Sequence, residues 1–367
     1  MSKKALRLLI PWMPALVGIL LLWARGIAPW NLFQAGFWPV VFLLQLWFFL
    51  APFRTVTFGE ICAGFSVGLS VTSPLIWLAA TLMDALVRQK PVAAFLKSKA
   101  VFGGTNLTGT VVAPVTEELF KAAVPLVLLF VLTRLGERPM AKVRTPVDFL
   151  ILSAASGAGF SLFENLFRAA RGDYGYLWPK FSSDVSWAIG PFRLFPEMYA
   201  SSFYNGDMIW FGHAGTAAAV GLAAGLFYHT RRRGVTVLLP IVTWLTVTWD
   251  HLLWNFQINR AKVWWKPTLG NLTLHGRVLP VLFLVLLAAS LALVWRRYAW
   301  YLGTRNADRF PPTRFTGLRS LPAVARTHRH SLMAAFGLFE AFQAGPKKAA
   351  RYGAFVGELV RKAAGRA

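Results

Sequence analysis

Long apolar runs, separated by short polar stretches, dominate the first four fifths of the chain. Roughly 20 apolar residues suffice for a helix to cross a bilayer, and we expect eight such spans at 8–24, 32–52, 60–83, 108–132, 147–168, 206–229, 235–256 and 277–296. Helices satisfy their backbone polar groups internally, whereas open sheet edges in lipid do not. The pattern therefore predicts an all-α, polytopic helical membrane protein with about eight transmembrane helices and a basic cytoplasmic tail.

The polar pattern changes after the last apolar run. We expect a membrane domain over residues 1–298 and a separate tail over 299–367, which is rich in Arg and Lys and has amphipathic stretches at 331–342 and 349–364. A basic amphipathic segment typically lies on an anionic lipid surface. The Gly- and Pro-containing segment 169–205 is predicted to be a long loop that does not span the membrane.

Composition supports this interpretation. Of 367 residues, 56% are hydrophobic and 15% are charged, whereas soluble domains have about 25% charged residues. The formal net charge of +24 would also suit nucleic acid, but basic loops that orient a membrane protein explain it more simply, so we do not expect a nucleic-acid partner. The single cysteine, Cys62, excludes an intramolecular disulfide and a cysteine-based zinc cluster.

Basic residues also predict the orientation of the chain. They cluster before the first span at 3–7, between the fourth and fifth spans at 134–144, after the sixth span at 231–233, and in the tail. With eight spans these clusters lie on one side, which the positive-inside rule makes cytoplasmic. We therefore predict that both termini are cytoplasmic, although the basic loop at 88–99 lies on the other side in this scheme.

Two adjacent carboxylates inside an apolar run are the most informative feature. Glu117 and Glu118 lie within the fourth predicted span, and Lys121 follows Glu117 by one helical turn. A charged side chain at membrane depth costs a few kcal/mol, so such a pair favours a functional site. The alternative is a buried ion pair with Lys121 that only holds helices together.

The next three spans carry polar residues at a matching depth. The glutamate pair comes early in its span, Glu164 late, His213 early and His251 late. Because consecutive helices run in opposite directions, all these groups fall in one layer, on the order of 5–15 Å inside the membrane edge. Each has a structural alternative: Arg168 can neutralise Glu164, and either histidine can bond to a backbone carbonyl.

Four motifs on consecutive spans resemble the PrsW family of bacterial intramembrane proteases, distant relatives of the CAAX prenyl endopeptidases. They are Glu-Glu-x-x-Lys at 117–121, Phe-x-x-x-Glu-Asn at 160–165, His213 before a run of small residues, and His-x-x-x-Asn at 251–255. The resemblance covers about residues 105–260. It implies hydrolysis of peptide bonds in a membrane-associated substrate, such as an anti-sigma factor, at the bacterial cell membrane.

The chemistry of these side chains agrees with such a reaction. Peptide hydrolysis needs an activated water, a base and donors for the oxyanion. A low-dielectric site favours the protonated carboxyl, so Glu117 is the expected base, with Glu118 and Lys121 orienting it. His251 and Asn255, one turn apart, are candidates for oxyanion stabilisation.

These residues leave open whether the site binds a zinc ion. His213, His251 and Glu164 would form a two-histidine, one-carboxylate set with a position for water. The chain lacks His-Glu-x-x-His, and the CAAX relatives have a histidine at the position matching Glu164. We therefore expect a water activated by glutamate near the outer leaflet, with or without zinc.

Two other functions remain compatible with these residues. Intramembrane Glu and His groups also serve proton relays, as in a proton-coupled transporter, although carriers usually contain internal repeats and none is evident here. A non-catalytic membrane scaffold would act through partners recruited by the tail. The shared, off-centre polar layer favours the peptidase.

Overall fold

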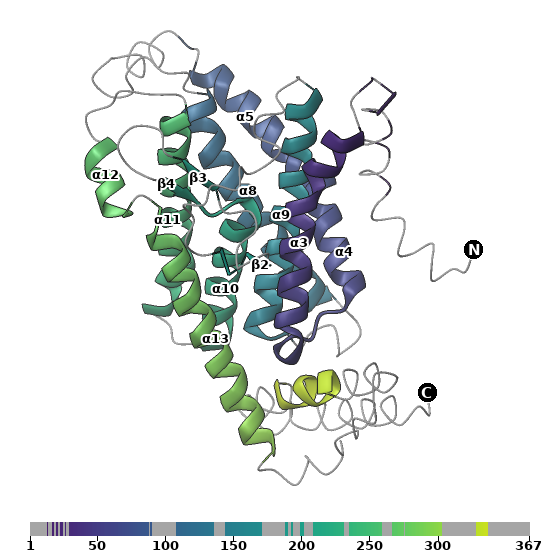
Figure 1. The fold of residues 1–367 in the computed structure, drawn as a ribbon. Coiled ribbons are helices and arrows are strands. Elements are labelled where there is room, and N and C mark those ends of the chain that lie inside the picture. Colours follow the sequence, from purple (N-terminus) through teal and green to yellow (C-terminus); the bar gives the residue numbers. More distant parts are fainter. Residues whose placement is uncertain are drawn as a thin grey trace.

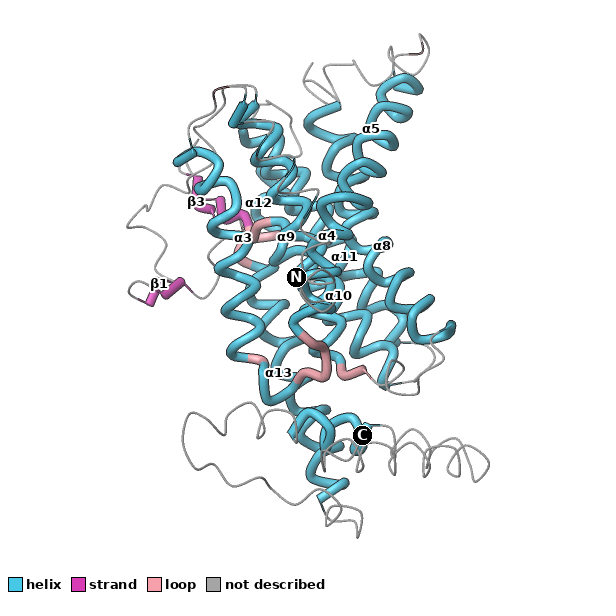
Figure 2. The backbone as a smooth tube through the Cα atoms, turned by 90° about the vertical axis from the view of Figure 1, so that its right-hand side faces the viewer, coloured by secondary structure: helices cyan, strands magenta, loops and turns pink. Residues whose placement is uncertain are grey.

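Helices make up most of the parts of the chain that the computed structural model describes. These parts are 29–87, 108–135, 144–170, 188–189, 192–193, 199–201, 208–230, 235–258, 266–274, 276–302 and 328–336, with isolated residues at 13, 17, 20, 23, 24, 26 and 89. The long helices run side by side as a bundle (Figure 1), and the view turned by 90° shows the same arrangement (Figure 2).

The bundle is built from α3 (Pro29–Phe49), α4 (Phe58–Val67), α5 (Ser73–Val87), α8 (Ala113–Leu135), α9 (Pro146–Ala170), α10 (His213–Thr230), α11 (Val235–Ile258) and α13 (Val278–Leu302). Shorter helical elements are η2 (Ala51–Phe53), α12 (Lys266–Leu272) and two π-helical turns, η3 (Gly68–Thr72) and η4 (Thr108–Val112). Since η3 joins α4 to α5, these three elements form one long, interrupted helix.

Within the described residues, four helices are long and apolar enough to cross a membrane: Phe58–Leu86, Pro146–Arg168, Thr236–Phe256 and Val278–Leu302. This confirms the predicted class, a polytopic helical membrane protein. The helices α3, α8 and α10 match three further predicted spans, but α8 holds three charged residues within two turns and α10 is made largely of weakly apolar Ala and Gly. The first predicted span, 8–24, lies mostly outside the described residues, so the total of eight stays a prediction.

Short strands precede α10, where a membrane helix was predicted to begin at 206. The strands β3 (Tyr199–Ser201) and β4 (Met208–Trp210) pair antiparallel, as do β1 (Ala188–Ile189) and β2 (Phe192–Arg193). Gly212 then adopts a positive φ of 76°, a left-handed conformation that suits glycine. The turn at this glycine makes His213 the first residue of α10.

The helix α9 lies at the centre of the bundle, almost entirely buried, and packs against α3, α4, α8 and α10. Glycines permit the closest approaches. A Cβ added to Gly157 would lie 2.4 Å from the carbonyl oxygen of His213, and one added to Gly68 would lie 1.9 Å from that of Ser156. Gly157 therefore sets how near α9 comes to the start of α10.

The first turn of α9 is anchored by Asp148. Its carboxylate accepts hydrogen bonds from the backbone nitrogens of Thr55, Val56 and Thr145 at 2.6, 2.9 and 2.7 Å. The Thr55 hydroxyl donates a further bond to it at 2.5 Å. This network ties the connection between η2 and α4 to the start of α9.

The described part of the tail, the helical segment 328–336, lies below the bundle in Figure 1. His328 bonds to the carbonyl oxygen of Pro52 at 2.7 Å, Arg329 donates to that of Thr55, and the guanidinium of Arg297 lies 4.7 Å from the Phe336 ring. This segment thus packs against protein, with its residues from 330 onward buried. The rest of the tail lies outside the described residues, and the domain boundary at 298/299 stays a prediction.

Candidate active site

The helix α8 brings the two glutamates and Lys121 into the middle of the bundle. Lys121 is fully buried, and its Nζ lies 2.5 Å from Glu118 Oε1 but 3.8 Å from Glu117 Oε2. The tighter ion pair is therefore with Glu118, three residues away, rather than with Glu117, which the helical spacing also brings within reach of Lys121. Glu117 is left with bonding capacity toward the other helices.

His213, at the start of α10, is held between two charged groups. Its Nδ1 lies 2.7 Å from Lys121 Nζ, and its Nε2 lies 2.7 Å from Glu164 Oε2 on α9. An ammonium group has only donors, so Nδ1 must accept its hydrogen bond and Nε2 must carry the ring proton that Glu164 accepts. The lone pair of His213 therefore points into the site.

His251, on α11, is oriented in a corresponding way. Its Nδ1 lies 2.8 Å from Glu118 Oε1, and because a carboxylate accepts, Nδ1 carries the proton. The bare Nε2 then faces Glu117 Oε2 at 3.7 Å, and His213 Nδ1 lies 3.9 Å from the same oxygen. Glu117 Oε2 is buried and has no hydrogen-bond partner among the described residues.

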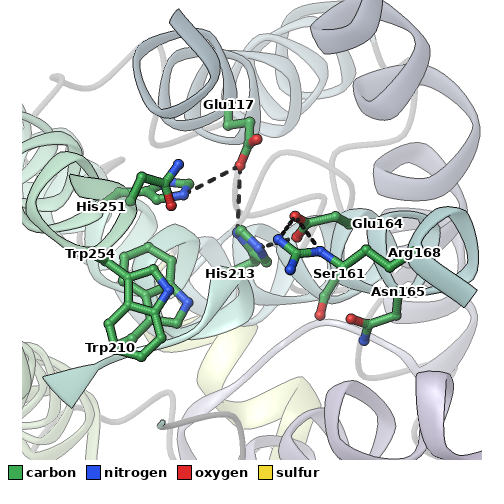
Figure 3. Close-up of a pocket in the computed structure, with 10 residues that line it drawn as sticks. Glu117, Ser161, Glu164, Asn165, Arg168, Trp210, His213, His251 and Trp254 are labelled. Atoms are coloured by element: carbon green, nitrogen blue, oxygen red, sulfur yellow. Dashed lines mark hydrogen bonds and ion pairs between the residues drawn. The ribbon is translucent and has the colours of Figure 1, made fainter. Parts of the chain in front are cut away.

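Glu164 lies at the outer side of this cluster. Its Oε1 accepts two bonds from Arg168, at 2.5 Å from Nη2 and 3.1 Å from Nε, while its Oε2 is used by His213. Both oxygens are thus engaged by neighbouring side chains. The carboxylate supports the imidazole from behind rather than facing the space between the histidines, as Figure 3 shows.

Aromatic rings surround the cluster. Trp210, at the end of β4, lies 4.4 Å from the His251 ring and 6.2 Å from that of Trp254, between ring centroids. Phe160 packs edge-on against His213 at 4.9 Å, and Lys121 Nζ lies 5.1 Å from the centre of the same Phe160 ring. These rings make the surroundings of the charged groups apolar.

An open pocket leads to the cluster, with a volume of about 590 Å³ that includes the solvent space at its mouth. It is lined by Glu117, Ser161, Glu164, Asn165, Arg168, Trp210, His213, His251, Trp254 and Asn255. In Figure 3, Glu117 points from α8 toward both histidines across this space. A substrate that enters the pocket would meet the Glu117 oxygen and the unprotonated nitrogen of His251.

Of the residues predicted from sequence, Glu117, Glu118, Lys121, Glu164, His213 and His251 are brought together by direct contacts. Asn255 lines the pocket, but its Nδ2 donates to the carbonyl oxygen of Gly109 in η4 at 2.8 Å. Asp250, beside His251, is buried, and its two oxygens have no hydrogen-bond partner among the described residues. Asp250 therefore shows no supporting bond to the cluster.

Three pocket residues, Ser161, Trp210 and Trp254, were not predicted from sequence. The two tryptophans were missed because tryptophans in such a chain usually mark the membrane interface. Their spacing from the two histidines could have identified them. Trp254 follows His251 by three residues, on the same helix face, and Trp210 precedes His213 by three.

The donor set fits a divalent metal ion. Glu117, Glu118, His213 and His251 each offer one ligand atom, and these atoms lie within 4.8 Å of one another. The unprotonated nitrogens of two histidines and a carboxylate oxygen are ligands that zinc accepts. The predicted set contained Glu164 instead. The distances favour Glu117 as the carboxylate that faces both histidines.

The comparison with protein families agrees with this geometry. The family model described as PrsW family intramembrane metalloprotease matches residues 58–290. The chain belongs to the PrsW family. No curated protein matches the chain, and no solved structure does.

Membership in the PrsW family makes the protein a membrane hydrolase that acts on peptide bonds. The match extends beyond the predicted range of 105–260 at both ends. It includes α4, α5 and much of α13, in which the sequence showed no recognisable motif. These helices lack the polar site residues, but α4 packs directly on α9.

Proposed function

We propose that this PrsW-family protein cleaves a membrane-associated protein with a water molecule activated by Glu117. The observation that carries the proposal is Glu117 Oε2, which is buried and has no hydrogen-bond partner among the described residues. It faces His213 Nδ1 at 3.9 Å, Lys121 Nζ at 3.8 Å and His251 Nε2 at 3.7 Å. A carboxylate with remaining acceptor capacity beside an open pocket is placed to take a proton from water.

Metal dependence is part of the proposal, with zinc as the ion. The unprotonated nitrogens of His213 and His251 would hold it, and Glu117 would lie beside it as the base. When bound, such an ion polarises a water molecule or the scissile carbonyl. Glu118 and Glu164 keep the two imidazole rings in the required tautomers, as carboxylates behind ligating histidines commonly do.

Asn255 has a positioning role in this proposal. Its amide holds the carbonyl of Gly109, so it ties α11 to the π-helical turn that leads into α8. The glutamates of α8 begin one turn after η4 ends. The amide would thus help to fix the depth of Glu117 in the bundle, and the oxyanion role of Asn255 stays a prediction.

The location and partners of the protein are also proposals. The clusters of basic residues favour a cell membrane with both termini in the cytoplasm and the site near the outer leaflet. An extracytoplasmic segment of a single-span protein, such as an anti-sigma factor, would then reach the pocket. The basic residues beyond 336 would contact anionic lipid.

Replacing Glu117 by Gln tests the function. The purified full chain is reconstituted in lipid vesicles with a library of single-span synthetic peptides that carry a fluorophore and a quencher. The wild type should cleave at least one peptide, and Glu117→Gln should be slower by at least about a thousandfold, because it removes the base.

Glu60→Gln is the matched control, since Glu60 pairs with Arg144 at 2.7 Å, away from the pocket. It should cleave at a rate near that of the wild type. Cleavage by Glu117→Gln at the control rate would refute the assignment. Peptide-dependent proton uptake without cleavage would instead support a transporter.

A further inference from the structure

We infer that Lys121 is a built-in competitor of the metal ion: its ammonium group and a divalent cation use the same donor atoms, so that the metal is held weakly and exchangeably. The inference rests on the proposed function in taking this cluster as the metal site. It adds that Lys121 limits the affinity of that site for the metal ion.

The competition follows from where the ammonium nitrogen lies. Lys121 Nζ is 2.5 Å from Glu118 Oε1, 2.7 Å from His213 Nδ1 and 3.8 Å from Glu117 Oε2. It therefore contacts or approaches three of the four members of the donor group. A single cationic nitrogen thus already uses two donor atoms of the group, Glu118 Oε1 and His213 Nδ1.

At His213 the two cations exclude each other. Nδ1 has one lone pair, and the ammonium uses it at 2.7 Å. A zinc ion would need the same lone pair at about 2.0–2.1 Å. The other ring nitrogen cannot substitute, because it carries the proton that Glu164 Oε2 accepts at 2.7 Å. The metal can bind His213 only after Lys121 has released it.

The release is a local movement. Glu118 Oε1 is the closer partner of Lys121 and belongs to the same helix, so the ammonium can keep this ion pair while it withdraws from His213. Lys121 is fully buried beside the Phe160 ring, which leaves it no route to water. Its positive charge therefore stays close to the site and repels a bound cation.

The lysine is not needed to prepare the ligands. Glu164 holds the tautomer of His213, and Glu118 holds that of His251. Removing the ammonium leaves both supports in place and frees the His213 lone pair. The net effect of the lysine on metal affinity is thus unfavourable.

Lys121→Met tests this, because methionine keeps most of the length of the side chain and removes the charge. Zinc is titrated into the purified full chain in competition with a fluorescent chelator at fixed pH. We expect Lys121→Met to bind zinc at least about tenfold more tightly than the wild type. Lys121→Gln, which can still bond to Glu118, should shift the affinity in the same direction.

Arg144→Met is the matched control. It also removes a buried cation, but Arg144 pairs with Glu60 Oε1 at 2.7 Å, away from the pocket. Its zinc affinity should change by less than about threefold. Equal or weaker zinc binding by both Lys121 variants, or no zinc binding by any variant, would overturn the inference.

The outcome is separable from that of the cleavage assay. Peptide cleavage by the wild type with unchanged zinc affinity in the Lys121 variants would refute the competition alone. Tighter zinc binding in those variants, with no peptide cleaved by the wild type, would refute the proposed function and leave the competition standing.

Discussion

The two ends of α9 each carry a carboxylate network, and the two networks differ in one respect. At the first turn, Asp148 receives three backbone N–H bonds and one hydroxyl bond from Thr55, Val56 and Thr145. Near the other end, Glu164 supports His213, and the neighbouring Glu117 Oε2 has no hydrogen-bond partner among the described residues. The Asp148 network is closed, because both carboxylate oxygens are hydrogen-bonded. The network around Glu117 is open, because one carboxylate oxygen lacks such a bond and the residue lines a pocket.

The difference separates a structural carboxylate from a reactive one. Buried polar groups in proteins are nearly always hydrogen-bonded, and a fully bonded group has no capacity left for a ligand. The Asp148 network meets this condition and holds the chain together. The Glu117 cluster does not meet it, and it lies beside a pocket of about 590 Å³. Burial of a charge therefore indicates function only where some of its bonding capacity remains.

Asp148→Ala should break the closed network and have the largest effect on stability. It leaves three buried backbone N–H groups without their acceptor, and we expect the free energy of unfolding to fall by about 3–5 kcal/mol. Unfolding in mixed micelles with increasing SDS measures this. Folded Asp148→Ala protein should bind zinc as the wild type does. An unchanged free energy of unfolding would show that the Asp148 network is not a structural anchor, and the contrast between the two ends of α9 would fail.

Glu164→Gln should weaken the open network without destabilising the fold. The imidazole of His213 loses its charged support, and zinc affinity should fall about 10- to 100-fold, as measured by chelator competition. Glu60→Gln makes the same chemical change elsewhere and should leave zinc affinity unaltered. An equal drop in both variants would show a general effect of charge rather than support of His213.

Asn255→Ala should have the smallest effect. It removes one neutral hydrogen bond to Gly109, which is worth about 0.5–1.5 kcal/mol of stability, and cleavage should slow by less than about tenfold. Stability and cleavage rate are measured on the same preparation. A loss of more than about a hundredfold in rate with unchanged stability would instead identify the amide as an oxyanion donor.

Sequence reasoning went furthest where periodicity and helix direction suffice. Alternating helix directions predicted that Glu117, Glu164, His213 and His251 share one level, and the contacts among them are those of one cluster. Which glutamate pairs with Lys121 was harder to predict from the sequence. Lys121 can reach back three or four residues along a helix, and spacing alone favoured Glu117, whereas the structure has the short contact with Glu118.

The amino-acid sequence by itself determined the class of the protein, the positions of the polar residues along the helices and the family motifs, because hydrophobic period and residue order are local properties. Only the tertiary structure decided which nitrogen of each histidine is bare, which glutamate faces them and where the Lys121 ammonium lies. Those outcomes depend on the rotation of each helix about its axis. That rotation follows from packing between distant segments, such as Gly157 against His213, and not from spacing along the chain.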